Sequence, residues 1–260
     1  MKVAFISLGC AKNLVNTEQM MALCRQAGHT LQEEPAGADA VVINTCGFID
    51  SAKEEAIDTI LSVAELKAEG QVGKILVTGC LTQRYQQEIL DELPEVDGIM
   101  GTGSYGEIVP ALAEMMSGGT PRRFADIHGM IDEFDRVLTT PKHYAYLRIA
   151  EGCDNRCAYC VIPSLRGRYR SRRMEDVLAE IAAGMPENIE LTVICGTNKQ
   201  TAEKLRRRHG ENPRVHIRGY VKDMSLMLDS ADLYLTKAGG ISTTEAAIKG
   251  VPLVLADAVG

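Results

Sequence analysis

Short apolar runs of strand length alternate with amphipathic stretches of helix length along the first part of the chain. The expected strands are residues 3–8, 40–44, 74–78 and 98–100. The expected helices are residues 14–27, capped by Asn13, then 51–67, 83–93 and 105–116. This alternation predicts an α/β fold with a doubly wound parallel sheet in the N-terminal domain, because each crossover helix returns the chain to the same end of the sheet.

Two breaks divide the chain into three expected domains, residues 1–140, 141–185 and 186–260. Residues 117–142 are rich in Gly, Pro and polar residues and are expected to form an interdomain connection. A new strand over 144–150, a cysteine-rich loop and a helix over 174–183 follow. Gly184-Met185-Pro186 then interrupts the chain, and a second strand–helix alternation begins.

The composition of the chain indicates its cellular location and which classes of partner it can bind. No apolar run approaches the ~20 residues that span a bilayer, and the N-terminus lacks the features of a signal peptide. We therefore expect a cytoplasmic protein, in which the 8 cysteines serve metal binding or catalysis rather than disulfides. The net charge of −7 argues against broad nucleic-acid binding through net charge, but it is compatible with a local basic patch.

Cys153, Cys157 and Cys160 have the spacing C-x3-C-x2-C. Three thiolates this close in one loop can bind three irons of a [4Fe–4S] cube, which leaves the fourth iron for an outside ligand. A zinc knuckle or chance clustering is the alternative, but zinc normally takes four ligands and no fourth Cys or His lies nearby in sequence. We predict these three cysteines as metal ligands and as the catalytic centre.

Cys10, Cys46 and Cys80 each lie one or two residues beyond an expected strand. Loops at the carboxyl ends of parallel strands converge on one edge of a sheet, so the sequence predicts a second three-cysteine metal site there. Three unrelated buried cysteines are the alternative, since free cysteine is commonly buried. Core packing is the better explanation of the other two, Cys24 and Cys195.

Five arginines follow the C-x3-C-x2-C loop within eight residues: Arg166, Arg168, Arg170, Arg172 and Arg173. Such a run is usually a solvated charged face. Planar guanidinium groups also suit a carboxylate or a phosphate-bearing partner, and the sequence leaves both interpretations open.

Several motifs resemble the N-terminal domain of radical-SAM methylthiotransferases. They are residues 5–13 (FISLGCAKN), 44–49 (NTCGFI), 78–81 (TGCL) and 101–103 (GTG), and the C-x3-C-x2-C loop follows in the order of that family. Residues 11–13 (AKN) and 162–167 (IPSLRG) resemble the RimO-type branch, which modifies an aspartate of a small-subunit ribosomal protein. The resemblance covers residues 1 to about 183 and ends early in the radical-SAM (β/α) barrel.

This resemblance implies a methylthiotransferase with two [4Fe–4S] clusters and S-adenosylmethionine (SAM). The first cluster, at Cys10, Cys46 and Cys80, would handle sulfur, and the second would generate the radical. A ribosomal protein is the implied substrate, with tRNA as the alternative, and flavodoxin or ferredoxin the implied electron donor. Because the barrel is truncated, a non-catalytic iron–sulfur-binding fragment is the alternative function, and residues 144–186 are expected to be poorly supported.

The last part of the chain resembles another family. Residues 191–198, 215–224 and 231–245 are similar to the C-terminal, donor-binding half of GT-B glycosyltransferases of the MurG and diacylglycerol glycosyltransferase group. This resemblance implies a partial Rossmann-like unit that binds a UDP-sugar, and hexosyl transfer as a further alternative function. Gly239 and Gly240 would open a helix whose N–H groups receive a diphosphate, with Thr243 and Glu245 as further nucleotide-sugar contacts.

Overall fold

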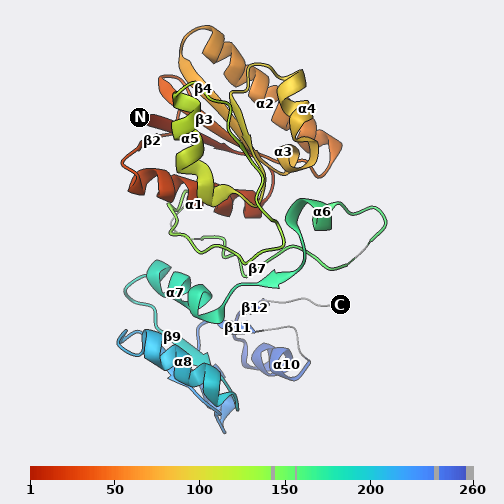
Figure 1. Cartoon of the computed structure of the whole chain (residues 1–260). Helices are drawn as coiled ribbons and strands as arrows, with labels where there is room; N and C mark the ends of the chain where they lie inside the picture. The colour runs from red at the N-terminus through yellow and green to blue at the C-terminus, as the bar shows by residue number, and fades with distance from the viewer. Residues whose placement is uncertain (142–143, 156, 237–239, 256–260) are drawn as a thin grey trace. The chain divides into compact units, whose positions relative to one another are not determined.

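The computed structural model describes residues 1–141, 144–155, 157–236 and 240–255. The chain forms two compact units, Met1–Val177 and Leu178–Gly260 (Figure 1). The three expected domains, 1–140, 141–185 and 186–260, remain a prediction.

Unit 1 is built on a six-stranded parallel sheet, which confirms the predicted α/β class. The strands in spatial order are β2 (Thr30–Gln32), β1 (Lys2–Ser7), β3 (Ala38–Thr45), β4 (Val72–Gly79), β5 (Gly98–Met100) and β6 (Arg122–Arg123). The chain changes direction across the sheet between β1 and β3, the kind of point where open α/β sheets bind ligands. Ser7 pairs with Asn44, and Asn44 with Thr78, so β1, β3 and β4 end level with one another.

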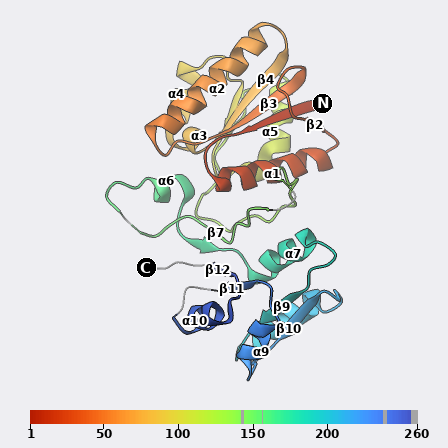
Figure 2. The ribbon, with the colours of Figure 1, turned by 180° about the vertical axis from the view of Figure 1, so that it is seen from behind.

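Helices cover both faces of this sheet (Figure 2). The helices α1 (Ala11–Gln26) and α5 (Ile108–Met116) pack on one face, while α2 (Asp50–Ala68), α3 (Cys80–Tyr85) and α4 (Gln87–Glu92) pack on the other. Successive β3 residues alternate between the two cores: Val42 packs with α1 and α5, and Ile43 with α2. Both are fully buried, which accounts for the nearly continuous apolar run of this central strand.

Several local expectations differ from the structure. The helix expected over 83–93 begins at Cys80 and is broken at Gln86, whose φ is 42°. Asn13 is not the cap of α1, because the helix already begins at Ala11. Its amide instead donates to the carbonyls of Leu8 and Thr45 and ties the helix to two strand ends.

Residues 117–141 of the expected connection are part of unit 1 and bond to its other residues. Residues 122–123 form β6, and the Ala125 N–H donates to the Ser104 hydroxyl at 2.8 Å. Further along, the buried Glu18 carboxylate accepts bonds from the Thr139 N–H and hydroxyl at 2.8 and 2.9 Å. This segment is therefore fixed at both ends by side chains of the N-terminal domain.

Unit 2 contains two small parallel sheets. One pairs β9 (Leu191–Ile194) with β10 (Val215–Arg218), and the other pairs β11 (Tyr234–Thr236) with β12 (Leu253–Leu255). Helices α8 (Lys199–His209), α9 (Met224–Asp229) and α10 (Gly240–Lys249) connect the strands, and α7 (Met174–Gly184) spans the boundary between the units. Among the described residues none of the helices is long and apolar enough to cross a membrane.

Candidate functional site

The three N-terminal cysteines lie on three adjacent loops at the carboxyl edge of the sheet. Cys10 follows β1 and precedes α1, Cys46 follows β3, and Cys80 follows β4 as the first residue of α3. Cys10 is exposed, Cys46 is half-buried and Cys80 is buried. The structure therefore brings these residues to the predicted edge, beside the point where the strand order reverses.

Glycines let the backbones of these loops approach closely. A Cβ atom on Gly9, which has a φ of +84°, would lie 2.5 Å from the Cys46 Cβ and 3.2 Å from its Sγ. A Cβ on Gly47 would lie 2.9 Å from the backbone N of Leu81 and 3.0 Å from the carbonyl carbon of Cys80. Real Cβ atoms essentially never approach a neighbour within 3.0 Å, and the shortest distance at each position is below that, so glycine at both positions lets these loops approach so closely.

The cysteines also influence one another electrostatically. Burial raises the pKa of the Cys80 thiol, Arg166 opposes this shift, and Cys46 and Cys10 add to it. Cys80 is therefore a thiol in the metal-free protein, and metal binding must displace its proton.

Among the described residues, no group of three or more His, Cys, Asp or Glu side chains is arranged to hold a single metal ion. A [4Fe–4S] cube is larger than one ion, so its cysteines need not meet at a point. Three soft thiolates on neighbouring loops are a donor set that suits an iron–sulfur cluster. The residues at this edge therefore fit the group that the sequence predicts.

The second cysteine loop is closed at its base. Strand β7 (Ala150–Glu151) pairs antiparallel with β8 (Arg170–Ser171), and the Cys153 N–H donates to the Gly167 carbonyl at 3.1 Å. Cys157 is exposed, while Cys153 and Cys160 are half-buried. The strand expected over 144–150 exists only at its last residue, because the segment has a pairing partner only in β8.

Polar contacts hold this loop against the N-terminal domain. Lys12, two residues after Cys10, donates to the Ala150 carbonyl at 3.0 Å and to Glu151 at 3.1 Å. The Thr102 hydroxyl donates to the Leu165 carbonyl at 2.5 Å, at the end of α6 (Ile162–Arg166). Residues up to Val177 thus belong to unit 1, although the sequence predicted poor support for 144–186.

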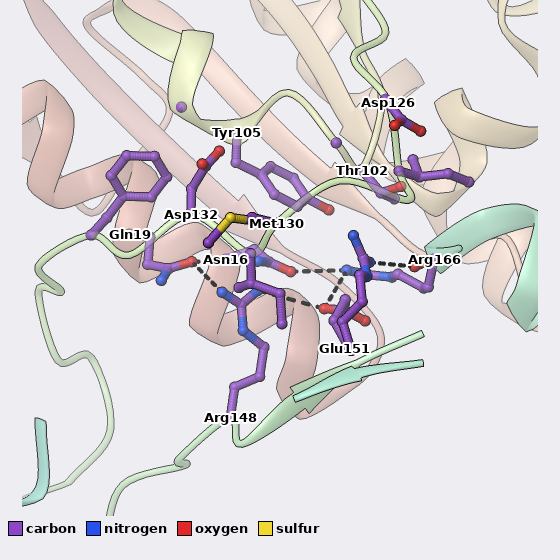
Figure 3. Close-up of a pocket in the computed structure, with 16 residues that line it drawn as sticks. Asn16, Gln19, Thr102, Tyr105, Asp126, Met130, Asp132, Arg148, Glu151 and Arg166 are labelled. Carbon is purple, nitrogen blue, oxygen red and sulfur yellow. Dashed lines mark hydrogen bonds and ion pairs between the residues drawn. The ribbon is translucent and has the colours of Figure 1, made fainter. Parts of the chain in front are cut away.

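Glu151 is the central carboxylate of this contact. Figure 3 shows the guanidinium groups of Arg148 and Arg166 converging on it, at 3.5 and 3.7 Å. Burial alone would raise the pKa of Glu151, but Arg166, Lys12 and Arg148 outweigh it and lower the pKa below the ordinary 4.5. The carboxylate is therefore ionised at neutral pH.

A cavity of about 60 Å³ lies beside this group. The buried hydroxyl of Tyr105, in the short 3₁₀ helix η1 (Tyr105–Glu107), and the Arg148 Nε line it without a hydrogen-bond partner. A polar cavity of this size has room for ordered water, which would satisfy both atoms.

The arginine run has mixed roles. Arg166 and Arg172 are buried, and Arg172 forms a forked pair with Glu133 at 2.6–3.0 Å. Arg170 donates to the carbonyls of Gly129 and Arg166, whereas the Arg168 side chain is 76% exposed. The run is therefore not a uniformly solvated face.

The residues that dock the second loop were not predicted as functional: Lys12, Asn13, Asn16, Thr102, Arg148 and Glu151. The signal available was the polar AKN segment after Cys10. Asn13 and Asn16 are fully buried one helical turn apart, where an ordinary amphipathic helix places apolar residues.

The other residues singled out in the sequence are Cys24 and the predicted nucleotide-sugar contacts of unit 2. Cys24 is fully buried in the core, where burial raises its pKa to about 12, as core packing predicts. In unit 2, Gly240 begins α10 and Glu245 is exposed on it, while Gly239 lies outside the described residues. Thr243 is also on α10. The UDP-sugar site stays a prediction.

Known proteins match the two parts of the chain differently. Residues 2–101 match the family described as "Uncharacterized protein family UPF0004", and residues 164–256 match the "Glycosyltransferase family 28 C-terminal domain". Proteins named "Ribosomal protein uS12 methylthiotransferase RimO" are 47% identical over 185 residues in Pelotomaculum thermopropionicum and 48% over 181 residues in Clostridioides difficile. Each alignment covers 69% of this chain, but only 40% and 41% of the relative.

The chain thus spans about 40% of the length of these curated relatives. The glycosyltransferase match begins at residue 164, before the break at 184–186, so it overlaps the segment that docks on the N-terminal domain. Both resemblances found in the sequence are confirmed: the chain is similar over about two thirds of its length to RimO-type methylthiotransferases, and over its last part to a glycosyltransferase C-terminal domain.

Proposed function

We propose that this chain carries the two cluster sites of a radical-SAM methylthiotransferase acting on an aspartate of ribosomal protein uS12. The observation that supports this most directly is the docking of the C-x3-C-x2-C loop beside the three loops that carry Cys10, Cys46 and Cys80. Cys10, Cys46 and Cys80 lie on one sheet edge. The Cys153–Cys160 loop is anchored to the same edge by Lys12.

In this proposal Cys10, Cys46 and Cys80 hold one [4Fe–4S] cluster, and Cys153, Cys157 and Cys160 hold the other. When bound, the clusters and SAM supply reductive cleavage of SAM and the sulfur for transfer. The chain's own residues fix the two loops. Lys12 binds Glu151 in β7, the strand that leads into the second loop. The hydrogen bond from the Cys153 N–H to the Gly167 carbonyl closes the base of that loop.

The exposed side of the second loop is where partners must approach. Cys157 and Tyr159 are exposed, Tyr159 to 87%, so an electron donor such as flavodoxin or ferredoxin can reach this loop. Ribosomal protein uS12 is the proposed substrate, because the curated relatives are named for it, and tRNA is the alternative. A ribosomal substrate implies a cytoplasmic location.

Anaerobic reconstitution with iron and sulfide, followed by iron analysis, tests this function. We expect about eight irons per chain, four for each cluster. Cys46→Ala and Cys157→Ala should each remove about four irons, whereas Cys24→Ala should remove none. Incubation with SAM and dithionite should then yield 5′-deoxyadenosine. About eight irons without this product would support the non-catalytic iron–sulfur alternative, and four or fewer in the parent would disprove one of the sites.

A further inference from the structure

The loop after β5 lies beside the Cys80 loop at the carboxyl edge of the sheet, and it has no cysteine. Strand β5 pairs with β4, which leads to Cys80, and residues 101–103 (GTG) follow β5 directly. The Thr102 hydroxyl donates to the Leu165 carbonyl at 2.5 Å. Leu165 is buried in α6, five residues after Cys160. A loop without a cysteine of its own therefore holds the helix that follows the second cysteine loop.

The same threonine is bonded on its other side to α3. Gln83 lies three residues after Cys80 on this helix, and its Oε1 accepts the Thr102 N–H at 3.0 Å. The Thr102 hydroxyl oxygen is 3.3 Å from the same Oε1. A Cβ atom on Gly101 would overlap this oxygen, so a larger residue at position 101 would displace Gln83 from Thr102. Thr102 thus bonds α3 through its backbone and α6 through its side chain.

Helix α3 is connected to the other loops of the first site. Cys80 is its first residue, and its Arg84 guanidinium donates at 3.2 Å to the carbonyl of Gly47, next to Cys46. Helices α3 and α6 lie side by side (Figures 1 and 2). A displacement of α3 at Cys80 therefore also displaces the acceptor on Gln83.

Thr102 and Lys12 hold opposite ends of the second cysteine loop. Lys12 binds Glu151 in β7, the strand that enters the loop, whereas Thr102 binds α6, the helix that leaves it. Helix α6 has only 5 residues, and helices this short are not stable on their own. Its position therefore depends on contacts with its surroundings, of which the Thr102 bond is one.

We propose that Thr102 is a positioning residue that couples the two cysteine sites. A cluster at the first site fixes the start of α3, and Gln83 and Thr102 transmit this constraint to α6 and so to the second cysteine loop. This rests on the proposed function, since it requires a cluster at Cys10, Cys46 and Cys80. Coupling between two sites is reciprocal, so a fixed second loop stabilises the first site in turn.

Amide hydrogen exchange of the metal-free, reduced full chain tests the bond to α6. Thr102→Val removes the hydroxyl and keeps the branched shape, whereas Thr102→Ser keeps the hydroxyl. The matched control is Thr59→Val, whose hydroxyl donates to the Glu55 carbonyl at 2.7 Å within α2. Thr102→Val should accelerate exchange over residues 161–167 by about 2- to 10-fold, the net contribution of one hydrogen bond. Thr102→Ser and Thr59→Val should match the parent there.

Unchanged exchange over 161–167 in Thr102→Val would overturn its role. Equal acceleration in α6 and in β4 would also overturn it, because a general loss of stability affects the whole unit and not one helix. If Thr102→Val does not fold, as judged by circular dichroism and gel filtration, Gln83→Met decides. It removes only the acceptor on α3 and should likewise accelerate exchange in α6.

The coupling itself is tested in a Cys157→Ala background, in which only the first cluster can assemble. Exchange over 161–167 is compared between the metal-free protein and the protein reconstituted to about four irons per chain. We expect the bound cluster to slow this exchange at least about 2-fold, and Thr102→Val to remove most of the slowing but not the iron. No slowing in the background, or equal slowing with Thr102→Val, would overturn the coupling. Failure of the background to bind about four irons would instead overturn the proposed function, and this proposal with it.

Discussion

Replacing Glu151 with glutamine removes the carboxylate that docks the second cysteine loop. Its side chain is 9% exposed and lies 3.1 Å from Lys12, 3.5 Å from Arg148 and 3.7 Å from Arg166. Removing one partner of a buried ion pair costs about 3–5 kcal/mol. Because Lys12 is partly exposed and keeps its bond to Ala150, we expect a loss of about 3 kcal/mol, which corresponds to a melting temperature lower by about 6–12 °C for a unit of this size.

The pH dependence gives the sharper test. The folded-state pKa of Glu151 lies below the ordinary 4.5, so its stabilising contribution is present above about pH 4.5 and is lost as the pH falls through the lowered folded-state value. Far-UV circular dichroism melts of the metal-free, reduced protein should give a lower melting temperature for the variant than for the parent at pH 7. The difference in melting temperature should become smaller in acid. Exposed Glu54→Gln is the control and should stay within about 0.5 kcal/mol. Equal melting temperatures at pH 7, or a gap unchanged in acid, would refute the reasoning.

Three further outcomes are expected. Gly79→Ala should lower the free energy of unfolding in urea by more than about 1 kcal/mol, because φ is +102° and the new Cβ would lie 2.4 Å from the Thr45 carbonyl oxygen. The control Gly118→Ala, with φ +92° and open space around the new Cβ, should lower it less. Equal losses would contradict the steric argument. Iodoacetamide at pH 8 should label Cys10, which is exposed, but not Cys24, because burial raises the pKa of the Cys24 thiol to about 12. Labelled Cys24 in mass spectrometry of the native protein would contradict this. Limited thermolysin digestion should cut near 184–190 and leave a fragment covering unit 1, whereas equally fast cutting within 117–142 would show that the packed connection opens readily.

The parallel sheet and the three cysteine loops were predictable because their signals are local. Apolar runs with buried neighbours on both faces mark β1, β3 and β4, and each expected strand overlaps the observed one. The cysteines follow these strands directly, so knowing that the strands are parallel was enough to place their loops on one edge.

What the sequence did not reveal depends on distant partners. Strand β6 consists of two arginines, whose sequence has no hydrophobic pattern typical of a strand. It forms because β5 has unpaired backbone groups at its edge with which β6 pairs. Arg166 and Arg168 look alike in the sequence, yet one side chain is 4% exposed and the other 76%. The difference arises from acceptors in α1, about 150 residues earlier in the chain. Local rules fail at these positions, as they often do where a structure supports a site.

The order of the strands has a consequence for biosynthesis. The three loops of the first site belong to β1, β3 and β4, so the ribosome has delivered all three cysteines by residue 80, well before the loop that starts at Cys153. At about 5–20 residues per second, several seconds of translation separate the two. During that interval Arg166, whose guanidinium contacts Asn13 and Asn16 of α1 in the folded chain, has not yet been synthesised. The three loops that carry Cys10, Cys46 and Cys80 are therefore synthesised before any residue of the C-x3-C-x2-C loop or of α6.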